Sequence, residues 1–423
     1  MIDRSLPPPT QTLFEIGLPP CEYVELDNGV PVCLVNLGTQ PVLRIEVIFK
    51  ASRPYEHKQM VAAATARLLR EGTALHTSEE ISRIVDYFGA SLNTPFGLDV
   101  NRVVIHCLTR FVPDVLPVLG EMVSQPSFPE DELKTFIKTN RERLKINLKK
   151  TDFVAYRRLT EHIFGTDHPY GYNSSAEAYE NLVREDITRH FQESYLSGNC
   201  LITVSGKPDL RTLPLLNNYL GSQIQIGIKD PVLSNPNAAP PRREYIKQAG
   251  ARQTAIRIGR KMFSRKHPDF HGMEILTHLL GGYFGSRLMA NLREEKGLTY
   301  NVQASLDTYI HDGYLYVGAE VGNAKVDLAI SEIYREMDRL RDEPVGEEEL
   351  QMLRTYMQGS ILNLIDGPFS VSDVHKWLNI EGLGADFFDK FIYTVRHITP
   401  QDLQALACKY LRREDFWEVI VGP

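Results

Sequence analysis

The chain has 423 residues, of which 43% are hydrophobic and 24% are charged, and its formal net charge is −7. This length exceeds what one hydrophobic core usually holds and favours two domains. Charges of both signs are mixed along the chain, which argues against a nucleic-acid-binding face. The sequence contains no apolar run of about 18 residues, so we expect no membrane-spanning helix. Five scattered cysteines and a Pro-rich N-terminus without an apolar stretch indicate a cytoplasmic protein with free thiols.

The first half is predicted to begin with a β-hairpin. Two runs of alternating apolar residues, 21–26 and 30–36, flank Asp27-Asn28-Gly29, which suits a tight turn. Thr77, with Glu80 three residues later, predicts the capped start of a helix. The other elements expected in this half are strands at 43–52, within 90–109 and at 199–206, and helices at 57–71, 113–124, 129–150 and 186–195.

The second half repeats this order after a segment, 226–243, whose Pro, Asn and Ser content predicts a linker. The expected elements are strands at 252–260, 298–309 and 313–321, and helices at 267–280, 286–295, 323–342, 347–365, 370–381, 386–395 and from Thr399. Residues 186–206 match 399–422 when the halves are laid on each other. We therefore expect an α+β fold of two tandem homologous domains, 1–225 and 244–423, each a mostly antiparallel sheet with helices packed on one face.

Several short runs carry a resemblance to a known family: Leu26–Gly29, Gly72-Thr73, Gly89–Asn93, His168–Gly171 and Leu292–Tyr300. In their order and spacing the chain resembles the insulinase/pitrilysin family of zinc metallopeptidases, of the two-domain bacterial type that is similar to mitochondrial processing peptidase. The resemblance extends over almost the whole chain. It implies that this chain forms half of a clamshell chamber and that a homologous chain completes it.

The zinc motif of that family is missing here. Its members carry His-x-x-Glu-His on the helix that precedes the Gly-Thr pair. Counting back from Gly72-Thr73, the places of the two histidines are held by Ala63 and Arg67, and the place of the glutamate by Ala66. Two zinc ligands and the base that would accept a proton from the zinc-bound water are therefore absent.

The family's third ligand, a glutamate on a later helix, falls at Arg143 by gap-free counting. Glu142 is its neighbour, but one carboxylate does not make a zinc site, because a catalytic zinc needs three protein ligands and an open position. Arg67 and Arg143 would also repel a dication. We expect no cofactor in this chain and a zinc ion only in a homologous partner.

Arg293 and Tyr300 are retained within the most specific run of the resemblance. In the family, an arginine and a tyrosine with this spacing project from the C-terminal domain toward the zinc site and hold the scissile carbonyl and its developing oxyanion. A guanidinium and a phenol are suitable donors for that task. The alternative is that Arg293 belongs to a solvated helix end and that Tyr300 merely precedes a strand.

A relocated metal site is the other arrangement to consider. His271, Glu274 and His278 lie near one face of a predicted helix, but the two histidines are two turns apart. One zinc, about 2 Å from each ligand nitrogen, could not easily bridge that rise of about 10 Å. We do not expect a metal there.

Two functions remain open at this stage. The chain is a non-catalytic subunit of a heterodimeric or larger zinc peptidase, in which a homologue supplies His-x-x-Glu-His and this chain supplies Arg293 and Tyr300. Alternatively it is a structural or peptide-binding member, like the core subunits of respiratory complexes. An independent peptidase with unrecognised ligands is a weaker third possibility. The resemblance implies unfolded peptides as substrates, which can add to a sheet edge.

Overall fold

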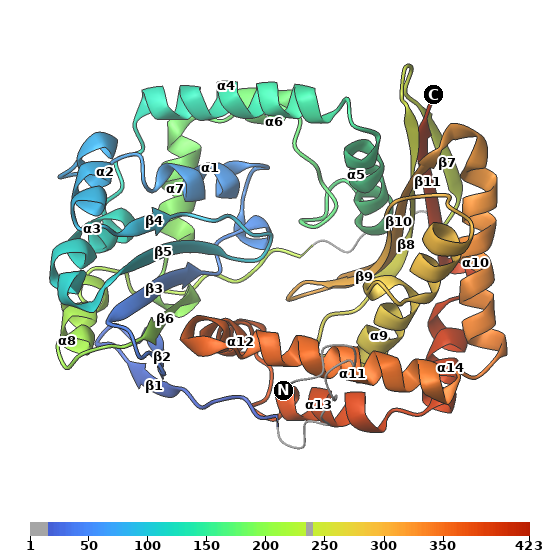
Figure 1. Ribbon diagram of the computed structural model, residues 1–423. Coiled ribbons are helices and arrows are strands. Elements are labelled where there is room, and N and C mark those ends of the chain that lie inside the picture. Colours follow the sequence, from blue (N-terminus) through green and yellow to red (C-terminus); the bar gives the residue numbers. More distant parts are fainter. Residues whose placement is uncertain (1–15, 234–239) are drawn as a thin grey trace, which may run out of the picture.

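Each half of the chain forms one twisted sheet with its own layer of helices, as a computed structural model shows (Figure 1). The structure describes residues 16–233 and 240–423. The centre of the predicted linker, 234–239, and the first 15 residues lie outside this description. The expectation of two α+β halves is confirmed, whereas the domain limits themselves stay a prediction.

The first sheet has the strand order β1-β2-β6-β3-β5-β4. Its strands are β1 (Glu22–Glu25), β2 (Pro31–Asn36), β3 (Val42–Phe49), β4 (Ser91–Asn93), β5 (Asn101–Leu108) and β6 (Cys200–Gly206). Only β2 and β6 are paired in parallel, and the other pairs are antiparallel. The predicted hairpin is confirmed, with Gly29 in the left-handed region at φ 80°.

The second sheet has the order β7-β11-β8-β10-β9, with β7 and β11 paired in parallel. Its strands are β7 (Arg243–Lys247), β8 (Gln253–Met262), β9 (Val302–Thr308), β10 (Gly313–Gly322) and β11 (Trp417–Gly422). Apart from β1, each strand of the first sheet has a counterpart at the same place in the second, and the parallel pair falls at the same place. The internal repeat is therefore confirmed at the level of topology.

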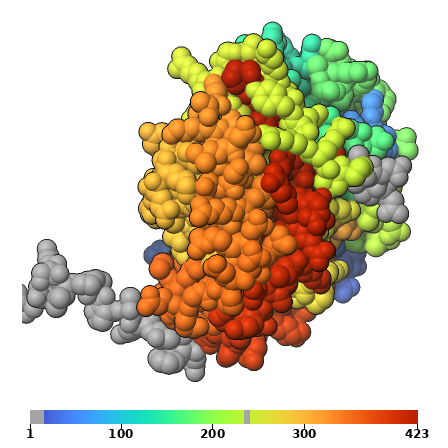
Figure 2. All heavy atoms as spheres, turned by 90° about the vertical axis from the view of Figure 1, so that its right-hand side faces the viewer, coloured from blue at the N-terminus to red at the C-terminus, as the bar shows by residue number. Residues whose placement is uncertain are grey.

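Helices enclose the main core of each half. The first half contains α1 (Val61–Leu68), α2 (Ser78–Tyr87), α3 (Val112–Ser124), α4 (Glu130–Asn147), α5 (Thr151–Phe164), α6 (Ala176–Glu180), α7 (Arg184–Ser194) and α8 (Thr212–Leu216). The second half contains α9 (Phe270–Thr277), α10 (Val326–Asp342), α11 (Glu347–Leu364), α12 (Gly367–Glu381), α13 (Phe387–His397) and α14 (Pro400–Tyr410). Figure 2 shows the outer face of the second half, which these C-terminal segments cover in orange and red. No helix within the described ranges is long and apolar enough to cross a membrane.

Several predicted helix limits were wrong. The helix expected from residue 57 begins only at Val61, because Met60 takes a left-handed conformation at φ 72°. The helix expected at 267–280 is α-helical only over α9 and continues as a wide turn, in which Gly281 leaves helical geometry at φ −161°. The capped start of α2 is confirmed, since Thr77 and Glu80 hydrogen-bond each other's backbone amides.

The halves exchange helices across their boundary. α5, from the first half, packs on β8 and β11 of the second sheet, and α12, from the second half, packs on β2 and β6 of the first. Each sheet is therefore covered on its second face by a helix from the other half. This second layer corrects the expectation of helices on one face only, and α5 has no counterpart among the helices expected from the sequence.

Buried charges hold α12 on the first sheet. Glu46, at 1% exposure in the middle of β3, lies 3.1 Å from Arg44 Nε and 3.0 Å from Lys376 Nζ. Arg44 donates in turn to both carboxylate oxygens of Asp373, at 3.2 and 3.1 Å, and to the carbonyl of Phe369 at 2.7 Å. A buried carboxylate is tolerated only with such partners.

Charged groups anchor α5 in the same way. Arg158 donates from two nitrogens to Glu244, at 2.8 and 3.1 Å, and His162 Nε2 lies 2.6 Å from the same carboxylate. The His162 ring stacks on Trp417 with 4.1 Å between ring centroids. Hydrogen bonds from Arg158 and His162 lower the pKa of Glu244 to about 2, because they favour its ionised form.

Removing the Glu46 charge should destabilise the whole chain. In Glu46→Gln, Arg44 and Lys376 lose their buried counter-charge, and we expect a loss of about 3 kcal/mol in the free energy of unfolding. Urea titration followed by circular dichroism measures this loss. The control Asp338→Asn breaks an exposed pair with Arg341 and should change stability by less than about 1 kcal/mol. Equal effects of the two substitutions would contradict a structural role for the buried pair.

Candidate functional site

The helix that matches the zinc helix of the family is α1, and buried contacts fix its start. Glu56 accepts a hydrogen bond from the Ala62 amide at 3.2 Å and another from the Tyr172 hydroxyl. That hydroxyl accepts in turn from the Met60 amide at 3.4 Å. The first amides of a helix have no acceptor within the helix and require one elsewhere. Glu56 and Tyr172 supply these acceptors and together cap α1.

Arg53 ties the loop that carries Tyr172 to this start. Its guanidinium lies 4.1 Å from the centroid of the Tyr172 ring and donates to the carbonyls of Pro169 and Tyr172, at 3.2 and 2.9 Å. Burial raises the pKa of Glu56 to about 7, although its hydrogen bonds and Arg53 act in the opposite direction. The start of α1 thus depends on a carboxyl group that titrates near neutral pH.

A cavity of about 480 Å³ lies where the zinc site of the family would be. Ala63, Arg67 and Arg143 line it together, so the structure brings these three sequence-predicted positions to one place. Ala66 does not line the cavity and is fully buried. The remaining lining residues include Arg53, Glu71, Thr94, Glu132, Asn140, Ser174 and Tyr179.

The side chains of this cavity do not fit a zinc ion. Arg67 Nη1 pairs with Glu71 at 2.9 Å, and the other oxygen of Glu71 accepts from Ser78 at 2.8 Å. The Glu71 carboxylate, which lines the cavity, is therefore already paired with a cation and a hydroxyl group. Arg143 adds a further positive charge to the same wall, and neither histidine nor cysteine lines it.

The second-half histidines do not form a metal site either. His278 Nδ1 is 2.9 Å from the carbonyl of Glu274, one turn earlier, while the pKa of His271 is lowered to about 4, first by burial. Within residues 16–233 and 240–423, no group of three or more His, Cys, Asp and Glu side chains is placed to hold a metal ion.

Arg293 and Tyr300 lie on either side of a turn that leads into β9. Both side chains are exposed, Tyr300 to 86%. The Arg293 guanidinium is 5.1 Å from the centroid of the Phe284 ring, and no carboxylate of the described chain pairs with it. Thr299 fixes the backbone beside Tyr300 by donating its hydroxyl to the carbonyl of Glu320 at 2.7 Å.

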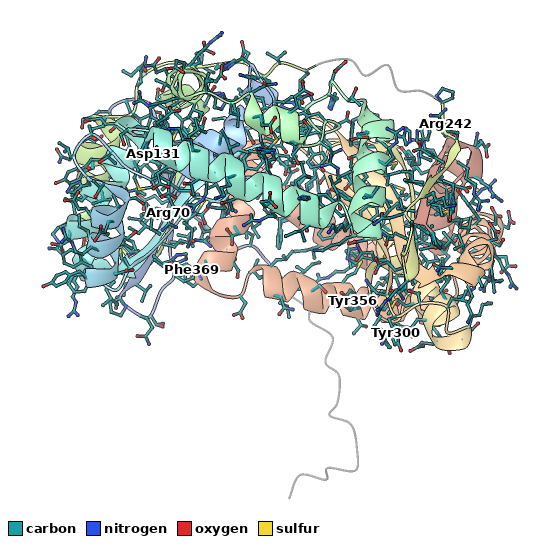
Figure 3. The ribbon with its side chains drawn as sticks, turned by 90° about the horizontal axis from the view of Figure 1, so that it is seen from above. Arg70, Asp131, Arg242, Tyr300, Tyr356 and Phe369 are labelled. Carbon is teal, nitrogen blue, oxygen red and sulfur yellow. The ribbon has the colours of Figure 1, made fainter. Side chains whose placement is uncertain are left out.

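Tyr300 lines a cavity of about 250 Å³ together with Asp152, Arg257 and Gln303. Arg293 does not line this cavity, so the structure of the single chain does not join the two residues in one pocket. Figure 3 shows Tyr300 at the end of the second half and Arg70, close to α1, in the first half. Neither Arg293 nor Tyr300 lines the cavity at α1.

Residues 181–357 match the family model described as "Peptidase M16 inactive domain". An uncharacterised zinc protease of Bacillus subtilis is 22% identical over 339 residues, which cover 79% of this chain and 82% of that protein. A crystal structure described as the peptidase M16 inactive domain from Pseudomonas fluorescens superposes with a TM-score of 0.85 at 19% identity, covering 95% of this chain and 98% of the other. The chain belongs to the insulinase (M16) family.

One relative is named as a non-peptidase. A non-peptidase homologue of Helicobacter pylori is 22% identical over 345 residues, which cover 78% of this chain and 77% of that protein. With Ala63, Ala66 and Arg67 at the positions of the zinc motif, this chain is a non-catalytic type of insulinase-family member.

The contacts around Glu56 were not found from the sequence. Glu56 and Tyr172 are 116 residues apart, and both belong to short irregular segments rather than to a periodic element. The nearest signal was the run His168–Gly171, which places an aromatic loop in the first half without showing what it contacts. Predicting a helix through His57–Met60 hid the role of Glu56 as an acceptor at the true helix start.

The isolated chain should bind no stoichiometric zinc, because its cavity offers arginines in place of imidazoles. Metal analysis of protein purified without chelators measures this directly. The triple substitution Ala63→His, Ala66→Glu and Arg67→His should also fail to bind zinc tightly, because Arg143 still stands at the third ligand position. A content of about one zinc per chain in the unmodified protein would overturn this interpretation.

Glu56 should make stability depend on pH. Its pKa is about 7 in the folded chain against a usual value of 4.5. Between pH 4.5 and 7, Glu56 is therefore protonated in the folded chain and ionised in the unfolded chain. Stability should therefore fall by up to about 3 kcal/mol as pH rises from 4.5 to 7 and then level off.

Glu56→Gln removes the titrating group and should remove this fall; it keeps one acceptor oxygen, while its NH2 group replaces the second acceptor. Urea unfolding of both proteins at several pH values between 5 and 8 measures the difference. Glu185→Gln, at an exposed carboxylate, is the matched control and should leave the pH profile as in the wild type. Parallel profiles for wild type and Glu56→Gln would contradict the assignment.

Proposed function

We propose that this chain is the non-catalytic subunit of a heterodimeric insulinase-type zinc peptidase of the cytoplasm. A homologous subunit would supply His-x-x-Glu-His and the zinc ion. This chain would supply half of the peptide chamber and a carbonyl clamp made of Arg293 and Tyr300.

The observation that carries the proposal is the contrast between the two halves. The first half has lost its zinc residues and has paired Arg67 with Glu71. The second half keeps Arg293 and Tyr300 exposed, with no ion pair for Arg293 in the described chain and with 86% exposure for Tyr300. Two donors that contribute little to the fold of their own chain are available to a site on another chain.

The chemistry of the pair suits an acyl substrate. A guanidinium and a phenol both donate hydrogen bonds, and such donors strengthen as negative charge develops on a carbonyl oxygen in a cleft from which water is excluded. Arginine also keeps its charge at any physiological pH. Hydrogen bonds from the amides of Lys296 and Leu298 to the carbonyls of Asn291 and Leu292 fix the backbone of the turn between the two donors.

The sheet edges support an extended peptide as the substrate. β4 and β9 are edge strands of their sheets, and β9 begins at Val302, two residues after Tyr300. An unfolded peptide can pair with such an edge through its main chain. The side chains of the peptide would then lie beside the cavity that Tyr300 lines with Arg257 and Asp152.

Removing either donor should slow catalysis by the assembled peptidase without preventing its assembly. For Arg293→Ala or Tyr300→Phe in a complex reconstituted with the zinc-bearing homologue, kcat should fall by about 10²–10³, which corresponds to about 3 kcal/mol. KM should change less, because the interaction forms mainly in the transition state. Arg293→Lys should restore little activity, since an ammonium group lacks the planar donor pair.

The controls use residues of the same type and exposure. Tyr87→Phe changes a phenol on α2 that is 80% exposed, and Arg252→Ala removes an exposed cation next to β8. Lys296 is unsuitable as a control, because it contacts Asn291 at 2.6 Å and the largely buried Glu332 at 3.1 Å. Equal rates for all these variants would refute the clamp, and failure to find any zinc-bearing partner in affinity purification would favour the structural alternative.

A further inference from the structure

One face of α4 forms a wall of the cavity at α1. The two helices pack against each other (Figure 1). The α4 residues that line the cavity recur at intervals of three or four, which places them on one side of the helix: Glu132, Thr135, Phe136, Thr139, Asn140 and Arg143. From the first to the last of them α4 rises about 16 Å, at about 1.5 Å per residue. The cavity therefore follows α4 over the length of about five residues of an extended chain, at about 3.3 Å each.

The remaining lining of this cavity suits a peptide. Met60, Leu68 and Phe96 supply apolar surface, and Thr94 and Ser174 supply hydroxyl groups for a main chain. An apolar lining with a few polar groups is typical of ligand pockets. Thr94 also follows directly on β4, an edge strand with which an extended chain can pair.

Arginines without a carboxylate partner gather at this cavity. Arg143, at the C-terminal end of the α4 face, is exposed and makes no ion pair with the described chain. The Arg53 guanidinium donates to two backbone carbonyls, at 3.2 and 2.9 Å. Arg157 stands behind the lining, where it donates to the hydroxyl and the carbonyl of Ser174 at 3.3 and 2.8 Å. None of these three cations is neutralised by an ion pair within residues 16–233 and 240–423.

The same three cations act on one phenol of the lining. Tyr179 lies beside Phe136 of α4, with 6.1 Å between the ring centroids. Burial raises the pKa of Tyr179, but Arg53, Arg157 and Arg143 act against burial, because a positive charge favours the phenolate. A negatively charged group of a ligand at this end of the cavity meets the same three charges.

The negative charges of the lining are placed differently. Glu71 is paired with Arg67 at 2.9 Å. Glu132 begins the α4 face, about three turns before Arg143, and makes no ion pair with a described residue. The cavity is thus positive at one end and negative at the other, which suits a ligand that carries a carboxylate at one end only.

We propose that the cavity at α1 binds the C-terminal end of an extended peptide, with its carboxylate at Arg143 and Arg53 and its chain running along α4 toward Glu132. A guanidinium holds a carboxylate through two parallel hydrogen bonds. An inorganic anion would meet the same cations but would leave the apolar lining uncovered. Binding needs this chain alone, so the site can fail while the clamp of Arg293 and Tyr300 holds, and the reverse.

Two peptides that differ only at the C-terminus test the proposal on the unmodified chain. Isothermal titration calorimetry at fixed ionic strength compares the peptide Ala-Ala-Ala-Leu-Phe with its C-terminal amide. The amide should bind at least about tenfold more weakly, because it loses the hydrogen bonds between a carboxylate and the arginines. Equal affinities, or no binding of the free acid, would overturn the proposal.

Variants of the lining test where the peptide binds. Arg143→Ala should weaken the free acid by about tenfold and leave the amide unchanged. Lys138→Ala removes an exposed cation of α4 outside the cavity and should change neither affinity. Ala63→Leu narrows the cavity without adding charge and should weaken both peptides. Equal losses in Arg143→Ala and Lys138→Ala, or unchanged binding in Ala63→Leu, would refute the site.

The direction of the peptide is tested at its other end. Glu132→Gln should weaken the peptide with a free amino group by about threefold, as for an exposed ion pair, and leave the N-acetylated peptide unchanged. The same effect on both peptides would overturn the assigned direction.

Competition separates a peptide terminus from a simple anion. Acetate or inorganic phosphate, at the concentration of the peptide, should not displace it, because neither covers the apolar lining. Displacement by either ion would show a general anion site and refute the peptide as its ligand.

Discussion

The fold depends on a carboxylate buried in the centre of a sheet. Glu46 is tolerated there because Arg44 from its own strand and Lys376 from the distant helix α12 both pair with it, and Arg102 of β5 lies 3.6 Å away. The opposite exchange, in which Arg158 and His162 of α5 contact Glu244, binds the second sheet to the first half. Together these contacts fix the two halves relative to each other and thus orient Tyr300 and the cavity at α1.

Most strands and the internal repeat could be predicted from the sequence, because their signals are local. Alternating apolar residues around Asp27-Asn28-Gly29 define the hairpin, and Thr77 with Glu80 defines the start of α2. The exchange of helices could not be predicted in this way. The apolar face of a helix shows that something covers it, but not which sheet does so. A usable signal was the fully buried strand β6, since a strand buried on both faces requires a second layer.

The candidate site, like the fold, could be predicted from the sequence only in part. The missing zinc residues at 63, 66 and 67 could be identified by comparison with the zinc motif of the insulinase family, and the structure gathers Ala63, Arg67 and Arg143 around one cavity. What replaced them could not be foreseen. Arg67 is neutralised by Glu71, one turn away, while the start of α1 is held by Glu56 and by a tyrosine from a loop far along the chain. Contacts over such separations leave no pattern in a single sequence.

The position of α12 also has a consequence for synthesis on the ribosome. The first sheet is complete once β6 has emerged, but the helix that covers its second face is made only after most of the second half. Until then Cys33, Val35, Ile48 and Leu201 form an apolar surface in contact with water or with a chaperone. Although the two halves repeat one topology, the first cannot reach its final state until α12 has been made, and the nascent chain is exposed to misassembly until then.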